Sequence, residues 1–377
     1  MKGSSKRLRV LFMIDHAGAL GGAERFVTGL ALHVPRERIE PWVCSTRCGE
    51  PHAVVELQEA GVPHLNLGRS SKLHVHRLSK LVAVMRRERF DVVHAHKFGS
   101  NLWGSTIGRA CGVPVIIAHE HNWSYTGDRL RAFLDGQVIG RLATRFIAVS
   151  EANRRRMVEL EGVPADKIIV LPTAYIPHSA PANGDIRAEL GLASDAPLVG
   201  VAAGLRTEKA LEVMLEAHSL LGGPGREAHL VIAGDGPCQA DLQRRARGLG
   251  IRERVHFLGE RRDVDSILRS VDVGAMSSDW EGMPLFVFEC MATDTPLVAT
   301  AVGGLTDIVQ NGTTGLLVPP RDPQALASAL TSLLADRPLA RRIAAAASAR
   351  LDQFTIKSVA ARFTDLYEQL SAQAGVR

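Results

Sequence analysis

The chain has 377 residues, 46% of them hydrophobic and 23% charged, a composition typical of globular proteins and unlike that of disordered chains. At roughly 150 residues per domain, this length predicts two domains. No apolar run reaches the ~20 residues of a membrane-spanning helix, and Asp15 and His16 end the first apolar run too early for a signal peptide. The five cysteines form no CxxC pair, which is typical of a reducing compartment, so we expect a cytoplasmic protein.

The two halves of the chain differ in charge. Residues 1–180 contain 25 Lys and Arg against 16 Asp and Glu, a net charge of +9. Residues 181–377 contain 20 against 24, a net charge of −4. The basic half predicts an anionic partner, for which nucleic acid, a membrane surface and an anionic acceptor are the candidates.

Short apolar runs alternate with helical patterns in the first half, which is typical of a parallel α/β domain. Leu78, Leu81, Val82 and Met85 recur at helical spacing, so the helix that carries them is expected to pack on a sheet. The predicted strands cover residues 9–14, 41–45, 64–67, 91–94, 113–118, 145–149 and 168–171. The predicted helices between them include residues 24–33, 73–89 and 150–161.

Residues 172–184 contain three prolines among small polar residues and are the predicted linker between the domains. After this segment the α/β alternation starts again, and we predict two Rossmann-like domains, residues 1–177 and 185–355, facing each other across a cleft. The predicted strands of the second domain cover residues 198–203, 229–233, 255–258, 271–276, 296–300 and 315–318.

The strongest chemical signal is the segment 281–289, which follows a predicted strand and a short polar loop. Pro284 suits the first position of a helix, so Glu281 is expected on the preceding loop and Glu289 on the second helical turn. A helix N-terminus at the carboxyl end of a parallel strand suits a phosphate, and a carboxylate such as Glu289 suits a ribose diol. The simpler interpretation is a pair of structural carboxylates, which the spacing alone favours.

The two glutamates, with Gly282, Met283 and Pro284 between them, resemble a motif of family 4 of the retaining glycosyltransferases, which have the GT-B fold. Further segments agree in order along the chain, at residues 21–24, 233–237, 257–259, 300–304 and 312–320. The resemblance extends over about residues 10–329. It implies that the second domain holds most of a nucleotide-sugar donor, and that residues 358–377 cross back to the first domain with a helix over 358–372.

The resemblance also implies individual roles. Glu289 would bind the ribose, and Glu281 would contact sugar hydroxyls near the reacting centre. The backbone amides of Met283 and Leu285 would face sugar or diphosphate oxygens, and the loop around Leu258 would hold the base. The first domain would contribute Gly21 and Gly22, where a Cβ would keep the backbone away from the diphosphate. Three residues complete the predicted donor-binding set: Gly282, Pro284 and Gly234.

Members of the resembled family place an arginine and a lysine, about five residues apart, against the departing diphosphate. Lys209 matches the lysine, but Gly204 stands at the arginine position and the nearest guanidinium is that of Arg206. Fixed cations are useful there because the leaving group gains negative charge in the transition state. Either Arg206 substitutes for the missing arginine or Lys209 acts alone; two solvated basic side chains are the simpler alternative.

Two H-x-H pairs follow neighbouring predicted strands, His94 with His96 and His119 with His121. Such pairs suggest a metal site, but no acidic ligand accompanies them at a recognisable spacing, so we expect no metal. Both pairs lie at carboxyl ends of strands, where open α/β sheets bind ligands. The resembled family has a histidine near the transferred sugar at this point, for which His121 is the first choice and His119 the second.

A D-x-D sequence at Asp263 and Asp265 is typical of a divalent-cation site in the other glycosyltransferase fold, GT-A. Here it precedes an apolar helical pattern, so Asp263 is predicted to be a helix N-cap instead. The Gly234–Gly236 glycines lack the rest of a dinucleotide-binding motif. We therefore expect neither a required metal nor a bound cofactor.

Taken together, the resemblance implies retaining transfer of a sugar from a nucleotide-diphosphate sugar, with UDP as the guessed nucleotide, to an acceptor hydroxyl in cell-surface polysaccharide or glycolipid synthesis. Alternatives are a GT-B epimerase or hydrolase of sugar nucleotides, and a non-catalytic binding protein. No nucleic-acid partner is expected. Basic faces around Lys80 and Arg155 are either solvated or dock on the anionic inner face of a membrane, which suits a lipid-linked acceptor.

Overall fold

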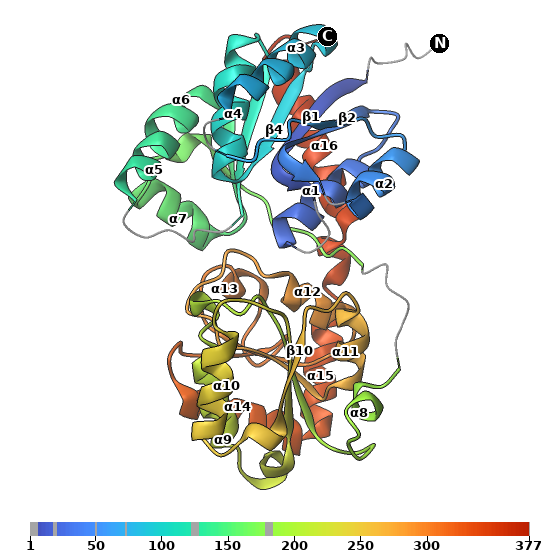
Figure 1. Ribbon diagram of the computed structural model, residues 1–377, viewed down its shortest axis with the longest axis vertical. Helices are drawn as coiled ribbons and strands as arrows, with labels where there is room; N and C mark the ends of the chain where they lie inside the picture. The colour runs from blue at the N-terminus through green and yellow to red at the C-terminus, as the bar shows by residue number, and fades with distance from the viewer. Residues whose placement is uncertain are drawn as a thin grey trace. The chain divides into compact units, whose positions relative to one another are not determined.

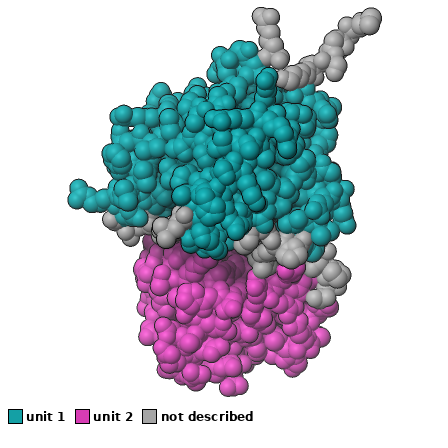
Figure 2. Space-filling view, turned by 45° about the horizontal axis from the view of Figure 1, so that its top comes forward, with its two compact units in different colours: residues 1–176, 354–377 teal, residues 177–353 magenta. Residues whose placement is uncertain are grey.

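The computed structural model describes residues 7–17, 21–49, 51–71, 74–121, 128–177 and 184–376. The chain divides into two compact units, coloured separately in Figure 2. Unit 1 comprises Met1–Ile176 together with Phe354–Arg377, and unit 2 comprises Pro177–Gln353. No helix among the described residues is both long and apolar enough to span a membrane.

Unit 1 is built on a seven-stranded parallel sheet in the order β3-β2-β1-β4-β5-β6-β7 (Figure 1). Its strands are β1 (Leu8–Ala17), β2 (Ile39–Gly49), β3 (His64–Asn66), β4 (Val92–His96), β5 (Val115–Glu120), β6 (Arg145–Ala148) and β7 (Ile168–Val170). Its helices are α1 (Gly22–His33), α2 (Pro51–Glu59), α3 (Leu78–Glu88), α4 (Lys97–Ala110), α5 (Arg129–Phe133), α6 (Gly140–Leu142), α7 (Glu151–Glu159) and α16 (Ile356–Gln373). Short 3-10 turns at Val75–Arg77 and Ala165–Lys167 and a π-helical stretch at Leu134–Ile139 complete it.

The central strand β1 shows why the sheet is covered on both faces. Val10, Phe12 and Ile14 pack in one buried cluster with α1 and α16. Leu11 and Met13, which alternate with them, pack in a second cluster with α3. Strand residues point alternately to opposite faces, so a strand that is apolar at every position must be buried on both sides.

The C-terminal helix α16 packs against α1 on unit 1, as predicted (Figure 1). The side chains of Phe363 and Tyr367 are fully buried, and Arg38 pairs with Asp365 and Glu368 at 2.7 and 2.6 Å. The predicted linker takes part in this arrangement, because the amide of Tyr175 donates to the carbonyl of Phe354 at 2.7 Å. The rest of that linker, residues 178–183, lies outside the described residues.

Unit 2 has a six-stranded parallel sheet in the order β10-β9-β8-β11-β12-β13. Its strands are β8 (Leu198–Ala202), β9 (His229–Ala233), β10 (Val255–Gly259), β11 (Val273–Met276), β12 (Leu297–Thr300) and β13 (Leu316–Val318). Its helices are α8 (Ile186–Glu189), α9 (Leu211–Ser219), α10 (Gln239–Gly248), α11 (Val264–Ser270), α12 (Leu285–Ala292), α13 (Leu305–Ile308), α14 (Pro323–Ala335) and α15 (Arg337–Ser348). Four 3-10 segments cover Thr207–Lys209, Gly223–Glu227, Arg252–Arg254 and Leu351–Phe354.

Both sheets confirm the predicted Rossmann-like architecture. In each, the chain adds two strands outward on one side of the first strand, then crosses back to its other side. The order reverses between β1 and β4 in unit 1 and between β8 and β11 in unit 2. Open α/β sheets bind ligands at the carboxyl ends of strands at such switch points. Ligand-binding residues are therefore expected in the loops after these four strands.

Candidate active site

Lys209 and Glu281 meet at the switch point of unit 2. Lys209 follows β8 and Glu281 follows β11, and Nζ of the lysine lies 2.6 Å from Oε1 of the glutamate. The hydroxyl of Ser278 donates to the same oxygen at 2.6 Å. Because Glu281 is only 3% exposed, its charge depends on Lys209 and Ser278 for stabilisation. The pair leaves Oε2 of Glu281 as the oxygen that is not shared with Lys209 and Ser278.

The backbone around Lys209 is tied down on both sides. Its amide donates to the carbonyl of Arg206 at 3.1 Å, and its carbonyl accepts from the hydroxyl of Ser277 at 3.0 Å. The next residue, Ala210, is fully buried in a left-handed conformation with φ of 44°. Left-handed backbone is costly for alanine and persists only where the surroundings enforce it. The lysine is therefore presented by a rigid turn.

Gly303 holds the loop that carries Glu281. Its φ is +51°, and a Cβ at this position would lie 1.7 Å from the carbonyl oxygen of Glu281. The amide of Gly304 donates to that same carbonyl at 3.2 Å, and the hydroxyl of Thr300 donates to the carbonyl of Ser278 at 2.6 Å. Residues after β12 thus hold the backbone of the loop after β11 in place.

The Gly303→Ala substitution is expected to destabilise unit 2 by more than 2 kcal/mol and to abolish activity, because the new methyl group displaces the Glu281 backbone. Gly312 provides a matched control, since its φ is +77° but a Cβ there would meet nothing within 4 Å. Gly312→Ala should cost only about 1 kcal/mol of backbone strain. Urea unfolding and activity measured on both variants test this, and equal losses in the two would contradict it.

Helix α12 follows Glu281 and carries Glu289, 5% exposed, on its second turn, as expected. Pro284 has φ −75° and ψ 133° and is the N-cap, one residue before the first helical position predicted for it. Its extended ψ ends the loop, and the helix begins at Leu285. The first amides of a helix have no intrahelical acceptor, so the amide of Leu285 is available to an anion. Gly282 and Met283 lie in the loop that leads into this helix.

Gly234 and Leu258 lie at the same edge of the unit 2 sheet. Gly234 follows β9 with φ of +142°, and a Cβ there would lie 1.9 Å from the carbonyl oxygen of Ala203. Its amide donates to the carbonyl of Gly259, the last residue of β10, at 2.7 Å. Leu258 precedes that glycine. The structure therefore gathers the predicted residues of unit 2 from the carboxyl ends of four strands.

Arg206 lies beside the position at which the expected arginine is missing. Gly204 is exposed, and a Cβ on it would lie 3.7 Å from Nε of Arg206 and 4.0 Å from the carbonyl oxygen of Asp235. These are ordinary van der Waals distances. The guanidinium of Arg206 thus lies next to the Cβ position of residue 204.

The four histidines of unit 1 form one cluster. His94 and His119 hydrogen-bond at 3.2 Å, and His96 and His121 at 2.9 Å. Nδ1 of His94 also hydrogen-bonds the hydroxyl of Tyr367 at 2.7 Å. Burial lowers the pKa of His94, His96 and His119 well below 6.5, and burial together with Lys97 lowers the pKa of His121 to about 3. All four imidazoles are therefore neutral at physiological pH.

Nitrogen atoms of His94, His96 and His119 lie within 4.8 Å of one another, the spacing of a metal site without an ion. However, both nitrogens of His94 are already hydrogen-bonded, to Tyr367 and to His119. Coordination through His94 would break one of these bonds in a buried site, which is costly. The hydrogen bonds therefore favour a structural role for His94, and metal independence stays a prediction.

Gly21 and Gly22 begin helix α1 of unit 1, where Gly21 is the N-cap. A Cβ on Gly21 would lie 2.0 Å from Oε2 of Glu24, so a larger residue here would require this carboxylate to move. Glu24 in turn accepts from Nζ of Lys97 at 2.5 Å, and Lys97 has a left-handed φ of 66°. Sequence reasoning missed this pair, as it missed the bond of Tyr367 to His94, because the partners are distant in the chain. It also missed Ser278, which lies three residues before Glu281 in the polar loop.

Asp263 is the N-cap residue of α11, as predicted, but its carboxylate does not cap the helix amides. Instead it accepts two hydrogen bonds of 2.8 Å from the guanidinium of Arg261, which also pairs with Glu189. The predicted N-cap position is therefore confirmed, while the carboxylate is held by arginine instead of the helix amides. The physical reason is that a bidentate arginine is a stronger partner for a carboxylate than a backbone amide.

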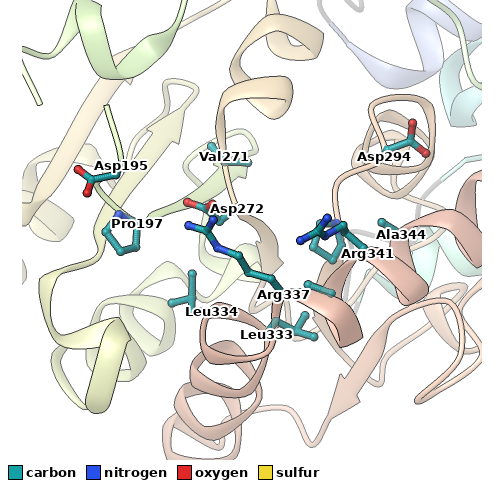
Figure 3. Close-up of a pocket in the computed structure, with 12 residues that line it drawn as sticks. Asp195, Pro197, Val271, Asp272, Asp294, Leu333, Leu334, Arg337, Arg341 and Ala344 are labelled. Carbon is teal, nitrogen blue, oxygen red and sulfur yellow. The ribbon is translucent and has the colours of Figure 1, made fainter. Parts of the chain in front are cut away.

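A cavity of about 440 Å³ lies at the opposite edge of the unit 2 sheet. Figure 3 shows Arg337 projecting from α15 toward Asp272, with Pro197 and Arg341 also in the wall. These lining residues precede β8 and β11 or belong to α15. The cavity contains none of the predicted site residues and lies away from the carboxyl ends of the strands, so we do not assign the donor to it.

Comparison with known proteins agrees with this geometry. Residues 20–177 match the model of Glycosyltransferase Family 4, and residues 183–350 match that of Glycosyl transferases group 1. A D-inositol 3-phosphate glycosyltransferase of Nocardia farcinica is 33% identical over 317 residues, covering 76% of this chain and 69% of the relative. The alpha-D-kanosaminyltransferase of Streptomyces kanamyceticus is 26% identical over 374 residues, covering 85% and 96%.

Among solved structures, Anabaena HepE in complex with UDP and glucose superimposes with a TM-score of 0.81 at 21% identity, covering 96% of this chain and 100% of that one. Two Rossmann-like units with these neighbours define a GT-B protein. The chain belongs to the family 4 glycosyltransferases, with a group 1 glycosyl transferase domain as its second half. Its chemistry is the transfer of a sugar from a donor.

Proposed function

We propose that the protein is a retaining hexosyltransferase that moves a sugar from a nucleotide-diphosphate sugar to an acceptor hydroxyl without a required metal. The observation that carries this is the ion pair of the partly buried Lys209 with the buried Glu281 at the switch point of unit 2. UDP is the proposed nucleotide, since HepE was solved with UDP and glucose. An Escherichia coli relative is named as a galactosyltransferase acting on a diphosphoundecaprenol, which supports a lipid-linked acceptor in surface-polymer synthesis.

Donor binding is assigned to the carboxyl edge of unit 2. Glu289 accepts hydrogen bonds from the ribose, and the start of α12, including the amides of Met283 and Leu285, faces the diphosphate. Backbone groups around Leu258 hold the base. Glu281 uses Oε2 for a sugar hydroxyl while Lys209 and Ser278 hold Oε1. Four glycines complete the proposed donor-binding set: Gly21, Gly22, Gly234 and Gly282.

In the proposed reaction the acceptor oxygen bonds to the anomeric carbon on the face from which the diphosphate leaves. The bond between that carbon and the phosphate oxygen breaks, and the acceptor proton passes to the diphosphate. Lys209 stabilises the charge that develops on the leaving group, and Arg206 supplies the second cation in place of an arginine at 204. His121 contacts the transferred sugar. No residue acts as a covalent nucleophile in this scheme.

Donor binding is expected to raise the thermal stability of the protein. UDP-glucose, UDP-galactose and GDP-mannose are compared by thermal shift, since a ligand at 100 times its dissociation constant adds about 2.7 kcal/mol. We expect a UDP-sugar to give the largest shift and Glu289→Ala to remove it. Incubation with labelled donor then separates a transferase, which needs an acceptor for turnover, from a hydrolase or an epimerase. No shift with any nucleotide sugar would refute the proposal.

The basic half of the chain is proposed to dock on an anionic membrane. On α5, Leu130 and Phe133 are 68% and 58% exposed, and Arg129 beside them is exposed. On α7, Arg155 is exposed, and Leu160 just beyond the helix is 51% exposed. Exposed apolar side chains among cations are typical of interfacial surfaces, where each basic residue contributes about 1 kcal/mol.

Co-sedimentation with vesicles tests this docking. Vesicles with phosphatidylglycerol are expected to bind the protein at low salt and to release it at high salt, while neutral phosphatidylcholine vesicles bind little. Leu130→Ser with Phe133→Ser should weaken binding at least tenfold, since two exposed apolar side chains no longer insert. Leu220→Ser, at a 49% exposed leucine of unit 2, is the matched control and should leave binding unchanged. Failure to bind anionic vesicles at low salt rejects the docking.

A further inference from the structure

His96 is the hydrogen-bond partner of His121 on one face of the unit 1 sheet. In the parallel pairing of β4 with β5, His96 is in register with His119. Side chains two residues apart share a face of a strand, so the two H-x-H pairs project together. Phe26 of α1 packs edge-on against His119 and His121, with ring centroids 5.5 and 5.4 Å apart. The rings are thus held by packing as well as by hydrogen bonds.

The hydrogen bond between His96 and His121 joins Nδ1 of the first to Nε2 of the second at 2.9 Å. His96 is fully buried, and its other nitrogen, Nε2, has no hydrogen-bond partner among the described residues. His121 is only partly buried, and the structure assigns no partner to its Nδ1 within the described ranges. Each neutral ring carries one N–H, so two arrangements of protons are possible.

The two arrangements differ in what they leave unpaired. If His121 donates, the proton of His96 is on Nε2, where a buried N–H has no acceptor. If His96 donates from Nδ1, a lone pair remains at Nε2 instead. Orphaned buried N–H groups are rarer in proteins than under-satisfied acceptors, and an unpaired buried donor bears the full desolvation cost. The second arrangement is therefore the more stable.

We propose that His96 is a positioning residue that donates its Nδ1–H to His121 and thereby fixes His121 as the tautomer with its proton on Nδ1. His121 then presents a neutral N–H donor to the transferred sugar. Such a donor matches an oxygen of the sugar and repels an ammonium group at the same place. The orientation of this donor toward a sugar rests on the proposed function, whereas the tautomer does not.

Nitrogen NMR of the free protein labelled with ¹⁵N-histidine tests the tautomer without any substrate. The signals of His121 are assigned by their loss in His121→Gln. We expect its Nδ1 to appear as a protonated nitrogen and its Nε2 as an unprotonated one. In His96→Leu, which removes the donor, the two nitrogens should average toward a tautomer mixture. His96→Asn, whose amide lies near the position of Nδ1, should restore the wild-type pattern.

Tyr367→Phe is the matched control. It removes the hydrogen bond to His94 in the same cluster and should leave the tautomer of His121 unchanged. With UDP-glucose as donor, His96→Leu is expected to lower kcat/KM roughly tenfold, His96→Asn to recover most of it, and Tyr367→Phe to change it little. A protonated Nε2 on His121 in the wild type, or an unchanged spectrum in His96→Leu, overturns the proposal. Inactivity with UDP-glucose alongside the expected spectra would contradict the proposed donor only.

Discussion

Lys209→Met is expected to lower kcat for sugar transfer by about 10²- to 10³-fold, the effect of removing one fixed stabilising group from a site of developing charge. The lysine is held 2.6 Å from Glu281 by a turn whose next residue is left-handed, so its charge is already in place before the reaction. Steady-state kinetics with saturating UDP-sugar measure the loss. KM for the donor should change less than kcat, because the leaving group gains its charge in the transition state.

Two further variants separate charge from folding in this test. Lys209→Met leaves Glu281 buried without its partner, which is destabilising by about 3–5 kcal/mol. Adding Glu281→Gln removes that charge and should restore the urea midpoint while the protein stays inactive. Lys357→Met, at an exposed lysine of α16, should be fully active. Activity retained in Lys209→Met would remove the central element of the proposed mechanism.

The contribution of Arg206 follows from the same kinetics. Arg206→Ala is expected to reduce kcat about tenfold, since an exposed cation contributes less than the partly buried Lys209. Gly204→Arg in that background should recover activity, because a side chain at 204 meets only ordinary contacts. An Arg206→Ala protein with unchanged kcat would show that Lys209 acts alone.

Acidification is expected to destabilise unit 1. Burial holds the pKa of His94, His96 and His119 below 6.5 in the folded chain, and that of His121 at about 3. Below pH 6.5 the unfolded chain takes up protons that the folded chain does not, so stability is complete above that pH and falls as the pH falls. At roughly 1 kcal/mol per histidine and pH unit, the four together cost on the order of 4 kcal/mol at pH 5.5.

Tryptophan fluorescence can follow unit 1 alone in a Trp280→Phe background, because Trp280 is the one tryptophan within the unit 2 sequence. Urea unfolding is compared at pH 7.5 and 5.5. His96→Leu should reduce the pH dependence by about one proton, whereas His76→Gln, at an exposed histidine, should leave it unchanged. Equal stability of unit 1 at the two pH values would show that these histidines accept protons in the folded state.

The residue pattern alone determined the two α/β halves and their strands, whereas the return of the last helix was implied by the resemblance to family 4. The apolar run at residues 10–14 of β1 and the spacing of Leu78, Leu81 and Met85 are local patterns, which need no knowledge of neighbours. Pro284 was misplaced by one residue because the same φ suits an N-cap and a first helical position.

Only the tertiary structure decided which side chains meet. Lys209 and Glu281 are 72 residues apart, and Gly303 supports the second of them from a third loop. His94 and Tyr367 are separated by 273 residues, and nothing in either local sequence indicates that bond. Such contacts depend on which strands become neighbours at a switch point. The choice of neighbours is set by the packing of the whole sheet, because a strand carries no local signal for its partner.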